Sequence, residues 1–422
     1  MLLRSLIVGF FLALRYLRRS SPWTSLLVIV IMLLTFLNVV VVRGVLIGLP
    51  TGATATYSRE YAGDVLITAL ADQKHIDRTH TIEKQLSQIE GYMAHTSRYL
   101  TGATVHANFQ TLPKSGHLAD KVTVTAVGIV PENENSVTHI GALVTEGRFL
   151  TDDDLRGVVI GDQLLEQYAG GGPQSGGTPE TSGTLLNVHP GTKVRISIND
   201  TVGEYTVVGV LDGKVGENAR RVFMHEQQLR TILGRSEDKK DEIAVRLRDG
   251  VDNVAWRDEL KNAGMSSYAT IRVPAEAQGH FLDEIKQTFG LLGNGIGFVG
   301  VVVAAITVFI MIFVIALNRQ KEIGILKGIG ISRVAIQSSY VFLALFYALV
   351  GILLGVFCVY AIIDPYIATH PIDFPFADGV LVVPWFDTFV RSIVLIATTV
   401  FAGYLPARMI VQKNTINAIL GR

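Results

Sequence analysis

Four long apolar runs constrain this chain more than any other feature of its sequence. Residues 20–42, 291–317 and 334–363 contain no Asp, Glu, Lys or Arg. A helix needs about 20 residues to cross the roughly 30 Å hydrocarbon core of a bilayer, and each run is that long. A fourth run, residues 389–407, contains Arg391 near one end, where its side chain can extend to the lipid headgroups. The sequence therefore predicts four transmembrane helices.

The positions of Lys and Arg predict how these helices are oriented. Short loops rich in these residues are retained in the cytoplasm. Basic residues precede the first run, separate the second from the third, and follow the fourth: Arg4, Arg15, Arg18, Arg19, Arg319, Lys321, Lys327, Arg333, Arg408, Lys413 and Arg422. Residues 364–387 contain neither Lys nor Arg. We therefore expect both termini in the cytoplasm and residues 49–288 outside, between the first and second helices.

The residues before the first run have a pattern of their own. Their arginines gather on one side of a helical wheel, which indicates an amphipathic helix over residues 1–22 that lies on the inner leaflet. The arginines could instead serve only to orient the first span. A cleaved signal peptide is a further alternative, since residues 53–55 read Ala-Thr-Ala, but the apolar run is longer than the usual 7 to 15 residues.

The large segment outside the membrane is expected to be a mixed α/β domain. Strand patterns cover residues 62–70, 121–130, 193–198 and 204–211, and helical patterns cover residues 81–92, 254–263 and 280–289. The only cysteine, Cys358, lies in the third apolar run, so this domain must be stable without disulfides. Residues 170–183 are rich in Gly and predict a loop.

The short basic segment between the second and third runs is a candidate binding surface. Residues 319–332 read RQKEIGILKGIGIS and place Ile323, Ile325, Leu326 and Ile329 at near-helical spacing. A small amphipathic helix at the cytoplasmic end of a membrane protein can be gripped by a soluble partner. We therefore expect this segment to bind a cytosolic protein.

The motifs of several enzyme classes are missing or incomplete. Residues 209–214 are one residue short of a phosphate-binding loop and are followed by Val215. His225 and Glu226 lack the second histidine of a zinc protease helix. With a formal net charge of zero there is no basic field for nucleic acid. We expect no catalytic residue, no metal site and no nucleic-acid partner in this chain.

Small residues in the apolar runs favour close packing of membrane helices. The relevant glycines are Gly293, Gly297, Gly351 and Gly355. Although residues 295–300 match a dinucleotide-binding string, no strand precedes them and apolar residues surround them. These glycines are therefore predicted to pack helices within one bundle or between two copies.

At several places the chain resembles a known family. Residues 317–336, LNRQKEIGILKGIGISRVAI, followed by GILLG at 351–355, are similar to the second and third spans of the FtsX-like, MacB-type and lipoprotein-releasing LolC/LolE-like ABC transporter permeases, sometimes called type VII. GYLPAR at 403–408 is similar to the family's terminal segment, and residues 146–168 and 190–214 resemble its outside domain.

This resemblance implies a mechanism and partners. Such permeases dimerise, as a homodimer or a related heterodimer, in the inner (cytoplasmic) membrane, and each binds a cytosolic P-loop ATPase subunit or fused domain. ATP and Mg are bound by the ATPase, and the permease itself binds no cofactor. The coupling residues implied here are Lys321, Glu322, Ile323, Ile325, Leu326, Lys327, Gly328 and Gly330, with Glu322 and Lys327 as polar contacts. Residues 280–288 would be a stalk continuous with the second helix.

The expected organisation is a helical membrane protein with a large α/β domain inserted between helices 1 and 2. The segments are a cytoplasmic amphipathic helix (1–22), transmembrane helix 1 (23–48), the α/β domain (49–288, with a β-rich lobe at about 146–224), transmembrane helix 2 (289–318), the coupling loop (319–333), transmembrane helix 3 (334–363), an outer loop (364–387), transmembrane helix 4 (388–408) and a cytoplasmic tail (409–422).

Three functions remain open from the sequence. The first is an ABC permease that exports or extracts a hydrophobic or lipid-anchored substrate. The second is an FtsX-like scaffold whose motion activates an outside partner such as a cell-wall hydrolase. The third, a receptor without an ATPase, conflicts with the apolar residues of the cytoplasmic loop, which have no role in it.

Overall fold

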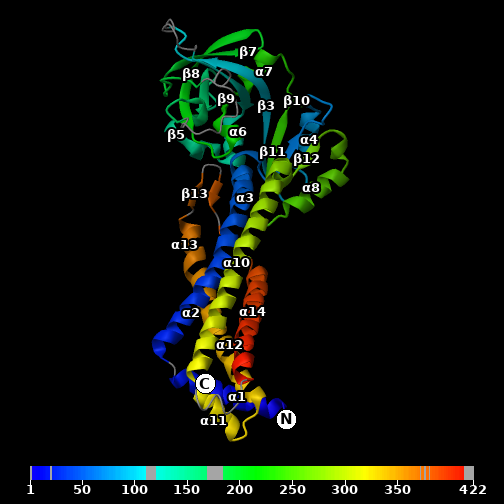
Figure 1. Cartoon of the computed structure of the whole chain (residues 1–422). Coiled ribbons are helices and arrows are strands. Elements are labelled where there is room, and N and C mark those ends of the chain that lie inside the picture. Colours follow the sequence, from blue (N-terminus) through cyan, green and yellow to red (C-terminus); the bar gives the residue numbers. More distant parts are fainter. Residues whose placement is uncertain are drawn as a thin grey trace. The chain divides into compact units, whose positions relative to one another are not determined.

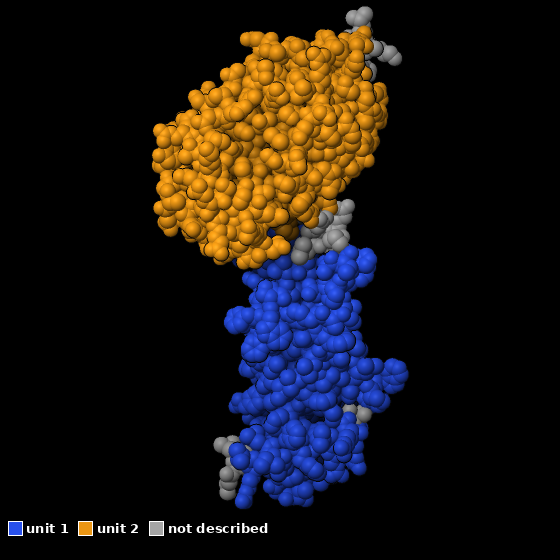
Figure 2. Space-filling model, turned by 180° about the vertical axis from the view of Figure 1, so that it is seen from behind, with its two compact units in different colours: residues 1–51, 283–373, 379–422 blue, residues 52–282, 374–378 orange. Residues whose placement is uncertain are grey.

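A computed structural model describes residues 2–19, 21–110, 120–168, 184–370, 372–374, 377–379 and 381–412. The chain divides into two compact units (Figure 2). The first, here called the membrane unit, contains residues 1–51, 283–373 and 379–422, and the second, the α/β unit, contains residues 52–282 and 374–378. The predicted Gly-rich loop at 170–183 and residues 413–422 of the predicted tail lie outside the described residues.

Within the described residues, four helices are long and apolar enough to cross a membrane. They cover Pro22–Ala62, Glu284–Asn318, Arg333–Thr369 and Trp385–Val411. The elements that build them, labelled in Figure 1 where there is room, are α2 (Pro22–Leu37), η1 (Asn38–Val42), α3 (Arg43–Tyr57), η2 (Ser58–Ala62), α10 (His280–Asn318), α12 (Arg333–Cys358), η6 (Val359–Ile363), α13 (Asp364–Thr369) and α14 (Trp385–Val411). The segments η1, η2 and η6 are π-helical turns.

The first long helix continues beyond the predicted transmembrane segment 23–48. Through α3 and η2 it reaches Ala62, with Pro50 inside the helix. A proline usually disturbs a helix because it lacks an N–H and crowds the preceding turn. The end of the transmembrane segment at residue 48 stays a prediction. The second helix, α10, begins at His280, so residues 280–288 and the apolar run belong to one helix.

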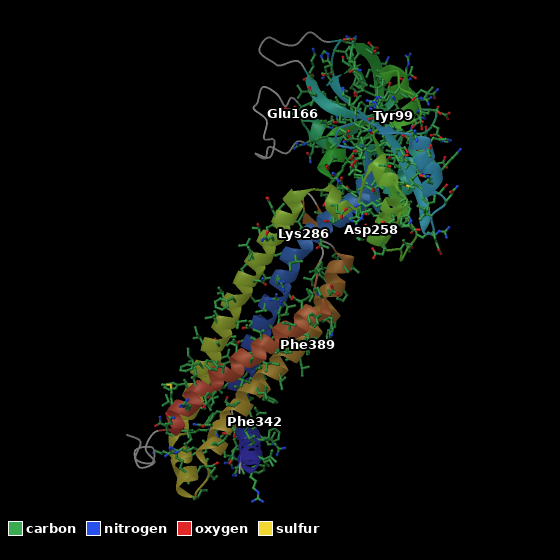
Figure 3. All side chains as sticks on the ribbon, turned by 90° about the vertical axis from the view of Figure 1, so that its right-hand side faces the viewer. Tyr99, Glu166, Asp258, Lys286, Phe342 and Phe389 are labelled. Atoms are coloured by element: carbon green, nitrogen blue, oxygen red, sulfur yellow. The ribbon has the colours of Figure 1, made fainter. Side chains whose placement is uncertain are left out.

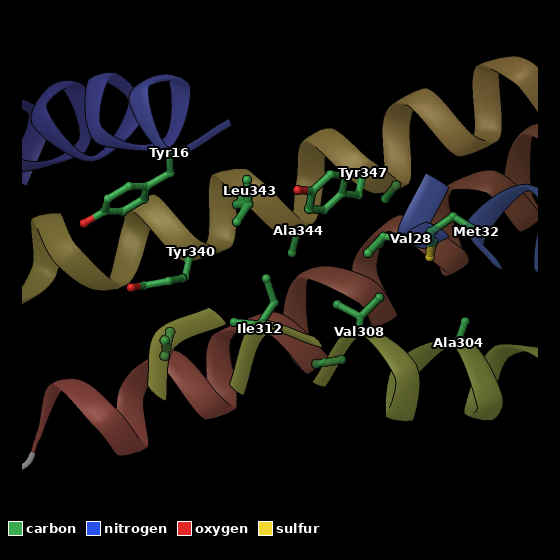
Figure 4. Packing of buried hydrophobic residues seen from close by; sticks show 14 of the residues in the cluster. Tyr16, Val28, Met32, Ala304, Val308, Ile312, Tyr340, Leu343, Ala344 and Tyr347 are labelled. Atoms are coloured by element: carbon green, nitrogen blue, oxygen red, sulfur yellow. The ribbon is translucent and has the colours of Figure 1, made fainter. Parts of the chain in front are cut away.

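Helix α12 is the centre of the membrane unit. It contacts α1 (Leu2–Arg19), α2 and α14. Its inward side chains, among them Tyr340, Leu343, Ala344 and Tyr347, pack with Met32 of α2 and with side chains of α10 (Figure 4). The amphipathic helix predicted over residues 1–22 therefore forms as α1, and one of its sides packs on another helix of the same chain.

The α/β unit is built on one long mixed sheet. The strands follow the order β12-β1-β11-β3-β4-β9-β6-β8-β5, and β7 pairs with β3 and β8. Their bounds, with those of the short pairs β10-β2 and β13-β14, are β1 (Val65–Thr68), β2 (Ile76–Asp77), β3 (Tyr92–His106), β4 (Lys121–Ile129), β5 (Val144–Gly147), β6 (Gly157–Gly161), β7 (Lys193–Ile198), β8 (Thr201–Leu211), β9 (Arg221–His225), β10 (Lys239–Lys240), β11 (Glu242–Leu247), β12 (Thr270–Arg272), β13 (Ile372–Phe374) and β14 (Ala377–Gly379).

Strand β3 joins two halves of this sheet. Its first part pairs with β11, and from Tyr99 onward it pairs with β4, which lies parallel to β9. Strand β4 therefore belongs with the strands of the predicted β-rich lobe. The bounds of that lobe, about residues 146–224, stay a prediction, and β4 precedes them in the sequence.

Helices pack on this sheet and complete its cores. They are α4 (Thr79–Leu86), α5 (Pro131–Thr138), η3 (Ile140–Leu143), η4 (Asp162–Leu164), α6 (Gly216–Ala219), α7 (Glu226–Leu233), α8 (Asn253–Asn262), η5 (Met265–Ser267) and α9 (Pro274–Ala277). Asp252 caps α8 by accepting from the backbone N–H of Val254 at 2.9 Å. His225 caps α7 in the same way, accepting from the N–H of Gln227 at 3.2 Å, so this histidine begins a helix.

Buried charges hold the end of the first long helix within the α/β unit. Arg98 of β3 is 1% exposed and donates to Glu134 of α5 at 2.6 Å and to the carbonyl oxygen of Tyr61 in η2 at 2.6 Å. The guanidinium groups of Arg98 and Arg221 lie 4.5 and 4.6 Å from the Tyr61 ring centroid. The Tyr61 hydroxyl donates to Glu242 of β11. The buried charge of Arg98 thus has two carboxylate partners, Glu134 at 2.6 Å and Glu242 at 3.5 Å, as a buried charge requires.

Candidate functional site

Helix α11 (Gln320–Gly328) forms where the sequence predicts a coupling helix. The chain leaves the helical conformation at Arg319, whose φ and ψ are −111° and 18°, and this bend separates α11 from α10. Gly330, at φ +90°, ends the turn after α11. The hydroxyl of Ser332 then caps α12 by accepting from the N–H of Ala335 at 3.3 Å. The segment is thus a short helix between two bends.

The eight predicted coupling residues divide between two faces of this segment. Lys321, Glu322, Ile325, Gly328 and Gly330 are exposed. Ile325 has 57% of its surface exposed and Glu322 59% of its side chain. Together they present an apolar side chain and both signs of charge.

The remaining three predicted coupling residues point inward to different degrees. Ile323 is 1% exposed and belongs to the hydrophobic core of the membrane unit, against which Leu326 also packs. Lys327 is half-buried. Its burial and the nearby positive charge of Arg333 lower the pKa of Lys327. The side chain of Ile323 thus holds α11 on the bundle, and its role in coupling stays a prediction.

An ion-pair cluster joins three helices of the membrane unit, and the sequence did not predict it. Arg43 of α3 donates to both carboxylate oxygens of Asp387 in α14, at 2.7 and 2.6 Å. Arg391 donates to Asp387 at 2.8 Å and to the side-chain oxygen of Asn294 in α10 at 3.3 Å. Arg391 was expected to extend toward the headgroups, and in the structure its guanidinium has Asp387 and Asn294 as polar partners.

Of the four glycines predicted to pack helices, Gly351 and Gly355 lie in α12, and Gly293 and Gly297 lie in α10. A Cβ on Gly351 would be 2.5 Å from the Cβ of Met32, and a Cβ on Gly355 would be 2.2 Å from the Phe36 ring, so these two bring α12 against α2. A Cβ on Gly293 would be 3.0 Å from the Arg43 side chain, whereas one on Gly297 would have ordinary contacts at 3.8 Å or more. Gly351 and Gly355 therefore pack helices within one chain.

A pocket of about 450 Å³ lies between the first and second long helices. Most of its wall is apolar, and Thr35 and Asn38 are its polar groups. Its lining residues are Ile31, Leu34, Thr35, Asn38, Ile296, Val299, Gly300 and Val303. The side-chain oxygen of Asn38 is buried and has no hydrogen-bond partner among the described residues. Such a pocket suits an apolar molecule with one polar group.

The described residues contain no group of three or more His, Cys, Asp or Glu side chains that could hold a metal ion. Their arrangement is that of a multi-pass membrane protein with an exposed amphipathic helix between its second and third spans. This class includes the membrane-spanning components of transporters.

Comparison with known families narrows this class. The family model of the MacB-like periplasmic core domain matches residues 26–263, and that of the FtsX-like permease C-terminal matches residues 294–415. The chain therefore belongs to the FtsX/MacB-type family of ABC transporter permeases, as its sequence motifs indicated.

The chain is also similar to individual proteins of this kind. It is 28% identical over 203 residues to the macrolide export ATP-binding/permease protein MacB of Agrobacterium fabrum, covering 45% of this chain and 29% of that protein. It is 24% identical over 290 residues to an uncharacterized ABC transporter permease of Methanocaldococcus jannaschii, covering 66% and 65%. The periplasmic region of MacB from Actinobacillus actinomycetemcomitans aligns with 14% identity and a TM-score of 0.35, covering 54% of this chain and 92% of that structure.

The chain spans about a third of the length of the first MacB relatives it matches, 29% and 33%. Those relatives carry ATP-binding and permease functions in their names.

Proposed function

We propose that this chain couples ATP hydrolysis by a P-loop ATPase to motion of its α/β unit. The ATPase is a partner subunit or a domain of the same polypeptide, and it binds ATP and Mg, while this chain binds no cofactor and is not an enzyme. The observation that carries the proposal is α11, a helix held on the bundle by Ile323 that exposes Lys321, Glu322 and Ile325. An exposed isoleucine between charged groups fits a groove on a folded partner.

The proposed topology places α11 and both termini in the cytoplasm of a cell with this chain in its inner membrane. The α/β unit then lies outside. The distribution of Lys and Arg supports this orientation, since residues 319–333 contain Arg319, Lys321, Lys327 and Arg333 while residues 364–387 contain neither Lys nor Arg.

The proposed substrate is a hydrophobic or lipid-anchored molecule, exported or extracted by a pair of permease copies. The apolar pocket beside Asn38 supports this substrate class. Large apolar side chains along α10, such as Phe298 and Ile306, are more than half exposed and leave this helix open to lipid or to a second copy. The pair of permease copies is a homodimer or a related heterodimer. Cargo or an outside partner then contacts the α/β unit.

Capture of the ATPase from native membranes tests the proposal. The full chain is purified gently, and the bound proteins are identified by mass spectrometry. We expect a P-loop ATPase with the parent chain and its loss in Glu322→Lys, because the new charge would face the proposed groove. Glu259→Lys, an exposed charge reversal on α8, is the matched control. For a fused ATPase the readout is substrate-stimulated ATP hydrolysis.

The same experiment distinguishes the other functions. A parent chain that neither retains an ATPase nor stimulates ATP hydrolysis would contradict coupling. If a cell-wall hydrolase co-purifies and a deletion strain accumulates no cargo, the scaffold function is supported and export is contradicted.

A further inference from the structure

We infer that Tyr16 and Arg319 position the coupling helix α11. Helix α1 thereby contributes to the ATPase-binding site. The link to an ATPase rests on the proposed function, whereas the contacts that position α11 all lie within the membrane unit. From the sequence, residues 1–22 were expected to lie on the inner leaflet or only to orient the first span, and Arg319 was not among the predicted coupling residues.

Arg319 occupies the bend on which the direction of α11 depends. It is the residue between α10 and α11, and its backbone is not helical. Its carbonyl oxygen accepts from the N–H of Ile323 at 3.0 Å, which begins the new helix. A change in the conformation of Arg319 would therefore change the direction in which α11 leaves the bundle.

The Arg319 side chain is held between an aromatic ring and a carboxylate. Its guanidinium carbon lies 4.6 Å from the ring centroid of Tyr16, within the range of a cation–π interaction. Its Nη1 lies 3.6 Å from a carboxylate oxygen of Glu322, and the side chain is only 19% exposed. The same residue thus touches α1 on one side and an exposed coupling residue on the other.

Tyr16 is itself fixed by α12. Its ring stacks on Tyr340 at a centroid distance of 5.9 Å, and the two residues are 6% and 0% exposed. Neither hydroxyl has a hydrogen-bond partner among the described residues. The contribution of Tyr16 therefore comes from its ring, which lies between Tyr340 and Arg319.

Further contacts hold α1 in place along α12. Gly9 lets the two helices approach closely, since a Cβ there would be 2.9 Å from the carbonyl oxygen of Ala335. Phe10 meets Phe342 edge to face at 5.6 Å, and Figure 3 shows Phe342 beside α1. The hydroxyls of Ser5 and Ser332 are 3.1 Å apart, which ties α1 to the cap of α12. The ring of Tyr16 thus has a rigid support.

Amide hydrogen exchange on the full chain in lipid nanodiscs, without ATPase, tests the inference. Tyr16→Leu removes the ring, and we expect amides of residues 320–328 to exchange about 2- to 30-fold faster, as loss of one cation–π interaction implies. Tyr16→Phe keeps the ring and should exchange like the parent. Phe11→Leu is the matched control, because Phe11 lies on the same helix and is 63% exposed.

The location of the change separates positioning from general loosening. Positioning predicts faster exchange in α11 with no change in residues 335–348 of α12. It also predicts that the effects of Arg319→Leu and Tyr16→Leu on exchange are less than additive, because both variants remove the same cation–π interaction, although Arg319→Leu also removes the ion pair with Glu322. Unchanged exchange of α11 in Tyr16→Leu, equal acceleration of α12, or fully additive effects would each overturn the inference.

Partner binding completes the test. Tyr16→Leu should weaken ATPase retention by a factor similar to its effect on exchange, and Tyr16→Phe should bind the ATPase like the parent. If the parent chain retains no ATPase, the proposed function fails, while the exchange data still decide whether Tyr16 and Arg319 position α11.

Discussion

At the scale of single residues, Gly63 follows the first long helix in a conformation that other residues rarely adopt. Its φ is +64° and its ψ is −150°. A Cβ there would be 2.4 Å from the carbonyl oxygen of Val245 in β11. Backbone and space therefore both require glycine at this position.

We expect Gly63→Ala to destabilise the α/β unit by about 1–3 kcal/mol through backbone strain alone. Thermal unfolding of the purified chain would measure the loss. Gly102→Ala, in β3, is the control, because a Cβ there meets no atom within 4 Å. Equal Tm values for the two variants would contradict this account of Gly63.

A second residue, Asp162, makes stability depend on pH. Burial and the nearby Asp212 raise the pKa of Asp162 from 3.8 to about 6. The folded chain then binds this proton more tightly than the unfolded chain, so the free energy of unfolding falls as pH rises from about 4 to about 6. We expect Asp162→Asn to be more stable than the parent at neutral pH.

Thermal unfolding between about pH 4 and pH 7 measures this dependence. The Tm of Asp162→Asn should change less with pH than that of the parent. Asp200→Asn, in the exposed turn between β7 and β8, should behave like the parent. A parent-like pH profile in Asp162→Asn would show that another group is responsible.

At the scale of elements, the buried pair of Arg98 and Glu134 links β3 to α5. Removing one partner leaves an unpaired buried charge, which typically costs about 3–5 kcal/mol, whereas an apolar replacement of both can be nearly neutral. We therefore expect Arg98→Met to lower the Tm strongly and Arg98→Met with Glu134→Leu to recover much of the loss. A double variant as unstable as the single one would show that Tyr61 and Glu242 need Arg98 more than Glu134 does.

The sequence predicted some elements better than others, for a physical reason. The strand patterns at residues 193–198 and 204–211 alternate because one face is buried and the other exposed, and they form β7 and β8. Strand β3 was missed because His95 and Arg98 interrupt its apolar pattern. Arg98 is buried only because Glu134, Glu242 and Tyr61 surround it, and these partners come from other segments of the chain.

At the scale of the whole molecule, the glycines of α12 could pack helices within one copy or form the contact between two copies, and a substitution can distinguish the two roles. Gly351→Leu should destabilise each copy, because its side chain would meet Met32 and the backbone of Leu33. Thermal stability and the oligomer recovered in detergent are measured separately. Gly290→Leu is the control, since a Cβ there meets nothing within 4 Å. Loss of the oligomer at unchanged Tm would assign Gly351 to the dimer contact instead.

The four apolar helices and the α/β domain could be predicted because each depends on residues close together in the sequence. A short helix between the second and third long helices could be predicted for the same reason. The cluster of Arg43, Asp387 and Arg391 could not, because Arg43 and Asp387 are 344 positions apart. The buried position of Ile323 also depends on helices from distant parts of the chain.

The π-helical turn η1 has a consequence for the phase of the first long helix. Arg43 is the first residue after this turn, and it reaches Asp387 at 2.6 Å. A π-helical turn contains more residues than an α-helical one, so loss of a single residue from η1 would restore regular spacing. Each residue of an α-helix advances the side chains by about 100°. The extra residue of η1 is accommodated within its own turn, so a one-codon deletion between residues 38 and 42 would leave Arg43 facing nearly the same direction. A one-codon deletion within the regular helix α2 would instead rotate Arg43 by about 100° away from Asp387, without changing any amino acid in the ion-pair cluster.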